Sequence, residues 1–487
     1  MSDSVVLDAE VDAVATRPTP LLSVPVPMSW GREDWHGSTQ AGVGQAGLLV
    51  GGRRRLLGDV VRARPAVLGR WTQALFGDDV PVFCKFLRTN FAPFVHFGFA
   101  TTVERGELLG WLRLEQRLMR QLFASLAITS AAGAAAFMAR YSAWAMNQSL
   151  GAPDGGGRVA RWGSVALDDE LLEATAASFR AGTTRAGLRS LLAEIRANRA
   201  RYCATVNLVD LREERGNMLL SPAGVPHAIN GLSEQTHPRD AAFAPLTSLF
   251  ATLRALVDRG ASEGELAAAV RAAGLAEARR ANAHPPKNEA WFPIEINGEL
   301  VLVEPQQSSN VTYSYADFTT PFAWNESRGA FVFRKGDPQA GLSDDQLASF
   351  VDALDLRPLS PASARRQPVA VDAGGAARGA QLYRMVDEPR IWPYFTAYLL
   401  RLEGGGSFPG RAPDGAFQTL LVLQGRVRLR HPQLPEALEL TPDQQPCAMV
   451  WATVPGGYTL EATDDAQVLF TSVPTPIPVT PAGLPAT

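Results

Sequence analysis

The sequence predicts a mainly β protein, with two jelly-roll barrels and substantial α-helical insertions. First, residues 381–475 contain short strand-like segments with Gly and Pro at their joints, which is typical of a jelly roll or sandwich. Second, strand-like segments recur at residues 81–100 and 291–307, and the latter holds Asn297-Gly298, a strong hairpin turn signal. Third, residues 104–146 carry leucines at helical spacing, which indicates helices inserted between the strands.

These patterns divide the chain into five parts. We expect an N-terminal extension and cap over 1–80, a first barrel over 81–335 with helical insertions at about 104–200 and 232–283, a helix and linker over 336–380, a second barrel over 381–475, and a tail over 476–487. Ser262 and Glu265 have the spacing of a capping box, which predicts that a helix of the second insertion begins there.

The composition limits the classes of partner. The chain has 46 Lys+Arg and 49 Asp+Glu, a net charge of −3, so a main partner that is nucleic acid or an anionic membrane is not expected. Three cysteines argue against a disulfide scaffold and a Cys-based zinc module. The first residues include acids and lack the basic start and apolar run of a signal peptide, so we expect a cytoplasmic protein. The sequence does not indicate which oligomeric state the protein adopts.

One apolar stretch is long enough to span a membrane. Residues 121–138 are rich in Ala, Gly, Ser and Thr rather than Leu and Ile, which favours a close-packed buried helix within the helical segment 104–146.

The most specific local motif is Gly216–Asn230, GNMLLSPAGVPHAIN. It resembles the second sequence motif of the cupin superfamily, in which a Pro-x-Gly turn directs a histidine into the barrel. A neutral imidazole at His227 would be a natural ligand for a divalent metal. The alternative is a simple turn followed by a buried, hydrogen-bonded histidine.

Four segments in chain order are similar to class I mannose-6-phosphate isomerases, and they cover about a third of the chain. The matching residues are Trp30-Gly31, Val82–Phe99 with Lys85 and His96, Pro222–Ala228 with His227, and Glu304–Ser314. The resemblance implies a zinc-dependent aldose–ketose isomerase acting on a sugar phosphate. It further implies that His96 and His227 are metal ligands, that Glu304 is an acid or base, and that Lys85 lies beside the metal.

The sequence departs from this family at three points. Phe94 stands where the family has a Gln ligand, Ser314 stands where it has an Arg, and the interval expected to hold its Glu ligand is helical here. We expect Glu289 to take the place of the family's Glu as a metal ligand. If Asn297-Gly298 is a two-residue turn, Glu289 lies on the same face of the hairpin as Glu304. The alternative is a solvent-facing hairpin with ordinary surface acids.

Three functions therefore remain open. The first is an active metal-dependent isomerase, the second a cupin-fold homologue that lost this activity and serves as a binding or accessory protein, and the third an iron oxygenase that uses two histidines and a carboxylate. The first and third require His96 and His227 to converge inside one barrel. Three other histidines (His36, His237 and His431) are expected at the surface. Gly404–Gly406 lacks the following helix or Lys of a phosphate loop.

Overall fold

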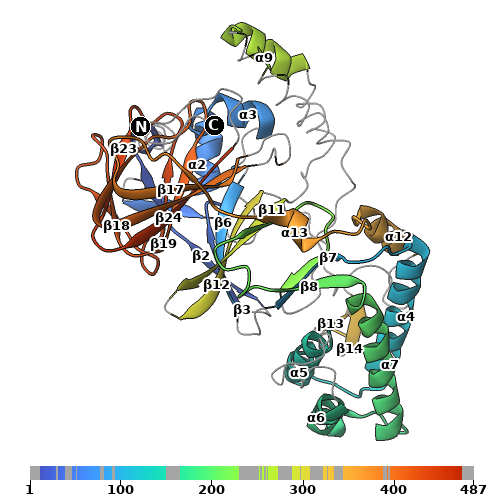
Figure 1. Ribbon diagram of the computed structural model, residues 1–487. Helices are drawn as coiled ribbons and strands as arrows, with labels where there is room; N and C mark the ends of the chain where they lie inside the picture. The colour runs from blue at the N-terminus through green and yellow to red at the C-terminus, as the bar shows by residue number, and fades with distance from the viewer. Residues whose placement is uncertain are drawn as a thin grey trace.

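The protein is mainly β, with barrel-like sheets and inserted helices, which confirms the predicted fold class (Figure 1). The computed structural model describes residues 11–28, 31–38, 46–50, 52–76, 80, 82–89, 94–149, 165–229, 252, 255–256, 259, 261–272, 288–296, 298–307, 322–325, 327–328, 330–333, 344–387, 392 and 395–473.

The larger sheet, here called the C-terminal barrel, has ten strands and is nearly closed. Its order is β1-β22-β19-β24-β18-β23-β20-β21, with β17 beside β18 and β16 beside β17. The strands are β1 (Thr19–Leu21), β16 (Val369–Val371), β17 (Arg378–Val386), β18 (Thr396–Gly410), β19 (Gln418–Gln424), β20 (Val427–Arg430), β21 (Leu438–Leu440), β22 (Cys447–Val450), β23 (Tyr458–Ala462) and β24 (Ala466–Ser472). Its interior is filled by alternate residues such as Leu400, Leu420 and Val468.

Two smaller sheets form the N-terminal barrel. One has seven strands in the order β15-β9-β11-β12-β6-β3-β2, and the other is β10-β7-β8. The strands are β2 (Val24–Met28), β3 (Gly31–His36), β6 (Val82–Thr89), β7 (Phe94–Phe99), β8 (Val206–Asp210), β9 (Met218–Ser221), β10 (His227–Ile229), β11 (Glu289–Ile296), β12 (Glu299–Gln307) and β15 (Arg365–Arg366). A compact core, including Phe97, Trp291 and Leu302, lies between them.

The central strands of the seven-stranded sheet are buried on both faces. Its inner face covers the three-stranded sheet, and its outer face packs on the C-terminal barrel through residues such as Cys84, Phe292 and Leu469. Polar side chains at the middle of the inner face, such as Glu289 and Glu304, are therefore enclosed within the N-terminal barrel.

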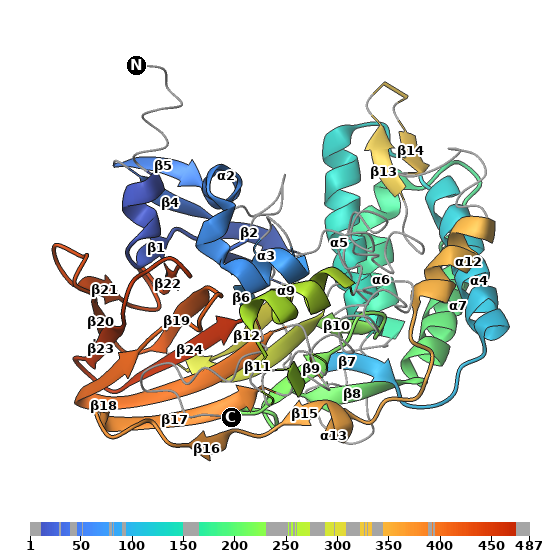
Figure 2. The same ribbon diagram turned by 90° about the horizontal axis from the view of Figure 1, so that it is seen from above.

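The first helical insertion forms a bundle on the far side of the N-terminal barrel from the C-terminal barrel (Figures 1 and 2). It consists of α4 (Arg105–Ala124), α5 (Ala131–Ser149), α6 (Val165–Thr175), the short η2 (Ala176–Ser178) and α7 (Arg185–Cys203) around a core of their own. The expected continuous helix over 121–138 is interrupted between Ala124 and Ala131. Among the described residues, no helix is long and apolar enough to cross a membrane.

The remaining elements are short. They are α2 (Leu57–Ala63), η1 (Pro65–Leu68), α3 (Arg70–Phe76), α9 (Glu263–Ala272), α12 (Asp344–Ala353), α13 (Pro361–Ala364), and the hairpins β4 (Gly47–Val50) with β5 (Arg53–Leu56) and β13 (Phe322–Asn325) with β14 (Ala330–Phe333). At the start of α9 the capping box is formed, because the Ser262 amide donates to Glu265 Oε2 at 2.8 Å. Most of residues 232–283 lies outside the described part.

Several segments are integrated into the barrels more closely than we expected. Within the predicted extension, β1 pairs with β22 of the C-terminal barrel, whereas β3 pairs with β6 of the N-terminal barrel. Within the predicted linker, β15 pairs with β9, and β16 pairs with β17. These pairings supply backbone partners that the local sequence does not reveal.

Candidate active site in the N-terminal barrel

The β11–β12 hairpin places two carboxylates on the inner face of the seven-stranded sheet. Ile296 lies opposite Glu299, as the Asn-Gly turn predicts, so Trp291 lies opposite Glu304. Glu289 shares the face of Trp291, because side chains two residues apart in a strand point the same way. Both carboxylates are buried, so the alternative of a solvent-facing hairpin with surface acids is wrong.

Lys85 lies directly opposite Glu304 on the neighbouring strand β6. Its Nζ is 2.9 Å from Glu304 Oε1 and 3.8 Å from Glu33 Oε2. The ammonium also lies 5.4 Å from the centre of the Trp35 ring, whose Nε1 donates to Glu33 at 2.7 Å. The site thus holds a buried cation between two carboxylates and against an aromatic face.

The charge of Lys85 is maintained by these neighbours. Burial alone would lower the pKa of its ammonium group, but the negative charges of Glu304, Glu33 and Glu289 outweigh burial and raise the pKa above its ordinary value. The surrounding carboxylates therefore favour the charged form of the Lys85 side chain.

The turn before β10 directs His227 into the barrel. Gly224 has a φ of +82°, which a glycine adopts without strain. The turn is held from two sides, because the Ala223 amide donates to Asn288 Oδ1 at 2.9 Å and the Asp355 amide donates to the Gly224 carbonyl at 2.7 Å. The Pro-x-Gly sequence therefore does position the histidine, as the motif predicted.

His227 and Glu289 form a second buried pair. His227 Nε2 lies 2.5 Å from Glu289 Oε1, and the imidazole packs edge-on against Trp291 at a centroid distance of 4.7 Å. His227 Nδ1 lies 3.2 Å from the carbonyl oxygen of Val225, which can only accept a hydrogen bond. The Ser221 hydroxyl lies 3.4 Å from the same nitrogen, so polar groups on both sides of the ring hold His227 in place.

His96 does not join this site. On β7 and β10, Phe97 lies opposite His227, and His96 lies opposite Ala228. Because side chains alternate along a strand, His96 and His227 point to opposite faces of the three-stranded sheet. Phe97 takes the inward position and contacts the Trp291 ring at 5.2 Å. The expectation that the two imidazoles converge is wrong.

His96 is instead buried in the wall of the barrel. Burial lowers the pKa of its imidazole to about 4, so the ring is neutral at neutral pH. Neither ring nitrogen has a hydrogen-bond partner among the described residues. Two other histidines expected at the surface, His36 and His431, are also buried, and His237 lies outside the described ranges.

The residues present do not fit the implied zinc site. In a tetrahedral site with bonds of about 2.0–2.2 Å, two ligand atoms lie about 3.3–3.6 Å apart. His227 and Glu289 instead lie at hydrogen-bond distance, and His96 faces away. No cluster of three or more His, Cys, Asp or Glu side chains in the described part is arranged to hold a metal ion. An iron site of two histidines and a carboxylate would need the same two imidazoles, so the residues present do not fit it either.

Sequence reasoning missed three buried residues of the site, Glu33, Trp35 and Gln306. Gln306 lies opposite Glu289, and its Oε1 has no hydrogen-bond partner among the described residues. The Glu304-x-Gln306 spacing on one strand could have indicated it. No local signal marks Glu33, because its place depends on the long-range pairing of β3 with β6. Two residues of the resemblance, Trp30 and Ser314, lie outside the described residues.

Comparison with known proteins gives a likeness in structure only. No family model and no curated protein sequence matches the chain. Among solved structures, a zinc-bound mannose 6-phosphate isomerase is 10% identical with a TM-score of 0.42, and a histidine-to-glutamine mutant of phosphomannose isomerase from Salmonella typhimurium is 11% identical with a TM-score of 0.44. Each match covers 94% of this chain and 100% of the other. At these values the likeness does not establish a shared activity.

Proposed function

We propose that the N-terminal barrel moves a proton between adjacent carbons of a sugar phosphate, as an aldose–ketose isomerase does. The observation that carries this proposal is the pairing of the Lys85 ammonium with Glu304 at 2.9 Å, on the same inner face as the His227–Glu289 pair. An enediolate mechanism needs a cation near the developing charge and groups that exchange protons. The substrate class comes from the sequence motifs that hold Lys85 and Glu304.

The proposed reaction uses only these side chains. Glu304 removes the proton from C2 of the open-chain aldose, and the electron pair forms the C1–C2 double bond while O1 gains negative charge. Lys85 stabilises that charge. The His227–Glu289 pair gives a proton to O1 and takes one from O2, and Glu304 returns its proton to C1. One C–H and one O–H bond break and one of each forms, so atoms and charge balance. No step is assigned to a metal.

Hydrogen exchange at carbon tests this proposal directly. Mannose 6-phosphate would be incubated with the purified protein in D₂O, and proton NMR would follow deuterium incorporation and ketose formation. We expect turnover, and we expect Glu304→Gln to lower its rate by about 10²–10⁴-fold, the usual contribution of an acid–base group.

Glu295→Gln is the matched control, because Glu295 is on the same strand as Glu289 but is exposed and paired with Arg215. It should leave the rate unchanged. The proposal is wrong if Glu304→Gln retains full turnover. Loss of both activity and tightly bound zinc in His96→Gln would refute the metal-free mechanism.

A second function is favoured by the orientation of His96. Because the two-imidazole site is not assembled, the second candidate is a cupin-fold homologue that binds a small molecule without converting it. Binding of mannose 6-phosphate that Lys85→Met abolishes, together with no exchange at carbon, would support this function over the isomerase.

A further inference from the structure

The C-terminal barrel has a polar surface pocket of about 310 Å³ on its outer face. Four of its lining residues form one row across the neighbouring strands β17, β18, β24 and β19 (Figure 1): Gln381 pairs with Arg401, Arg401 with Gln467, and Gln467 with Gln424. Side chains of directly paired residues share a face, so three amides and one guanidinium lie side by side at the strand spacing of about 4.8 Å.

The pocket borders the contact between the two barrels. Leu399 precedes Arg401 by two residues on β18, and Leu469 follows Gln467 by two residues on β24, so both lie on the same face as the row. Both leucines are fully buried in the core shared with the N-terminal barrel. The row therefore marks the point where this face of the sheet leaves the apolar interface and becomes accessible.

The polar groups of the row are only partly used within the protein. Gln467 Nε2 donates to Gln424 Oε1 at 2.9 Å, and the Tyr383 hydroxyl donates to Gln381 Oε1 at 2.7 Å. The Arg401 guanidinium makes no ion pair with a described residue, and it stacks 4.9 Å from the centre of the Tyr383 ring. These contacts hold the side chains in place and leave amide N–H groups, the Gln467 carbonyl and the guanidinium N–H groups for a ligand.

The charges of the lining favour a neutral ligand. Among the described residues of the lining, Arg401 is the one cation, against the two carboxylates of Glu403 and Asp465. Asp465 is fixed at the rim because its Oδ1 accepts a hydrogen bond from the Gly404 amide at 2.9 Å. A net negative lining opposes phosphates and carboxylates, whereas hydroxyl groups can both donate to carboxylates and accept from amides and guanidinium.

We propose that this pocket binds a neutral sugar. Adjacent amide and guanidinium groups can each make two hydrogen bonds to neighbouring hydroxyls, and the contact with the Tyr383 ring holds the Arg401 guanidinium in place for them. The binding site is separate from the N-terminal barrel, and the inference does not depend on the chemistry proposed there.

Saturation-transfer NMR with D-mannose, D-glucose and cellobiose, each tested separately on the full chain, can detect such a site at dissociation constants of about 1 mM. We expect at least one of these sugars to bind, and Arg401→Ala to weaken its binding by about tenfold or more, as loss of a charged hydrogen-bond donor does. Gln467→Ala should weaken it as well. Both side chains are at the surface, so the barrel core is unchanged.

Two controls locate the site. Arg428→Ala removes an exposed arginine on β20 that is paired with Glu439 and should leave binding intact. Glu304→Gln alters the N-terminal barrel and should also leave it intact, which separates this site from the proposed active site. The inference is overturned if none of the three sugars binds, if Arg401→Ala binds as tightly as the unmodified protein, or if inorganic phosphate displaces the sugar.

Discussion

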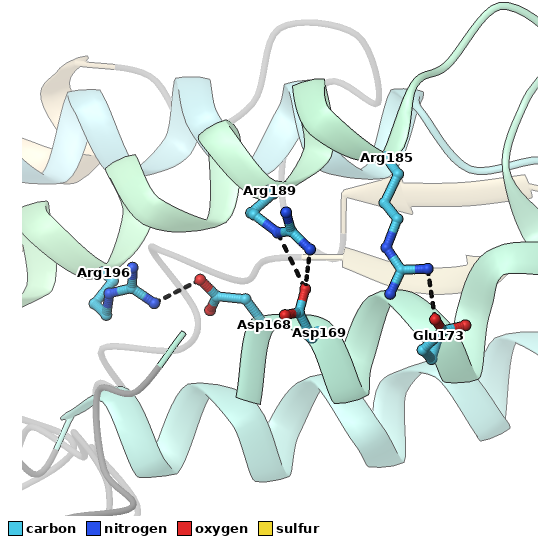
Figure 3. Close-up of polar contacts among 6 residues, drawn as sticks. All are labelled: Asp168, Asp169, Glu173, Arg185, Arg189 and Arg196. Carbon is cyan, nitrogen blue, oxygen red and sulfur yellow. Dashed lines mark hydrogen bonds and ion pairs between the residues drawn. The ribbon is translucent and has the colours of Figure 1, made fainter. Parts of the chain in front are cut away.

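The ion pair between Asp168 and Arg196 should contribute more to stability than two other ion pairs that join α6 to α7 (Figure 3). The Asp168 carboxylate is fully buried, and it also accepts a hydrogen bond from Trp144 Nε1 at 2.9 Å. Asp169 with Arg189 and Glu173 with Arg185 lie along the same two helices, but their side chains are about half exposed.

The expected magnitudes follow from burial. Asp168→Ala leaves the indole N–H of Trp144 without its partner, which costs about 1–3 kcal/mol, and it removes an ion pair to a partly exposed Arg196, worth about 1 kcal/mol. We therefore expect a loss of about 2–4 kcal/mol. Asp168→Asn keeps an acceptor for Trp144 and should cost less. Asp169→Ala and Glu173→Ala should each cost under about 1 kcal/mol.

Native-state hydrogen exchange, read by mass spectrometry on peptides from α6 and α7, measures the opening free energy of this bundle separately from the barrels. Because the pairs of Asp169 and Glu173 are exposed, added salt should weaken them more than the pair of Asp168. The reasoning is refuted if Asp169→Ala lowers the opening free energy as much as Asp168→Ala, or if Asp168→Asn and Asp168→Ala are equivalent.

Two further predictions concern a glycine and a histidine in the N-terminal part of the chain. Gly69→Ala should be more destabilising than Gly456→Ala. Both glycines have positive φ, which costs about 1–2 kcal/mol for alanine, but only at Gly69 would the added Cβ meet backbone, 2.3 Å from the Gly415 carbonyl oxygen. Equal urea midpoints for the two variants would contradict this. His36 is buried beside Phe86, and burial lowers its pKa from 6.5 to about 3, so the unfolded chain takes up a proton below pH 6.5 while the folded protein does not. Stability should therefore fall by about 2 kcal/mol from pH 7 to pH 5 on account of this group, and urea unfolding of His36→Leu should show a correspondingly smaller pH dependence.

The local sequence was sufficient to predict how residues of the site are arranged where they lie within one hairpin. The Asn297-Gly298 signal predicted the observed register of β11 and β12, and alternation along the strands then places Glu289 and Glu304 on the same face. The Pro222-x-Gly224 turn likewise indicated the inward direction of His227, because the turn and the strand that follows it are adjacent in the chain.

The face occupied by His96 could not be predicted in the same way. β7 has the sequence FVHFGF, in which nearly every residue on both faces is apolar, so periodicity does not show which side is inward. The pairing with β10 decides that Phe97, and not His96, lies beside His227. A shift of one residue in this register would exchange the two side chains.

The sequence by itself therefore determined the mainly β fold, the hairpin register and the inward turn at His227, because each depends on residues close together in the chain. Only the tertiary structure decided that Lys85 lies between Glu33 and Glu304, that His96 faces away from His227, and that the predicted extension supplies strands to both barrels. Each of these depends on which distant strands pair, and the energy of that pairing comes from burial of whole sheet faces rather than from any local pattern.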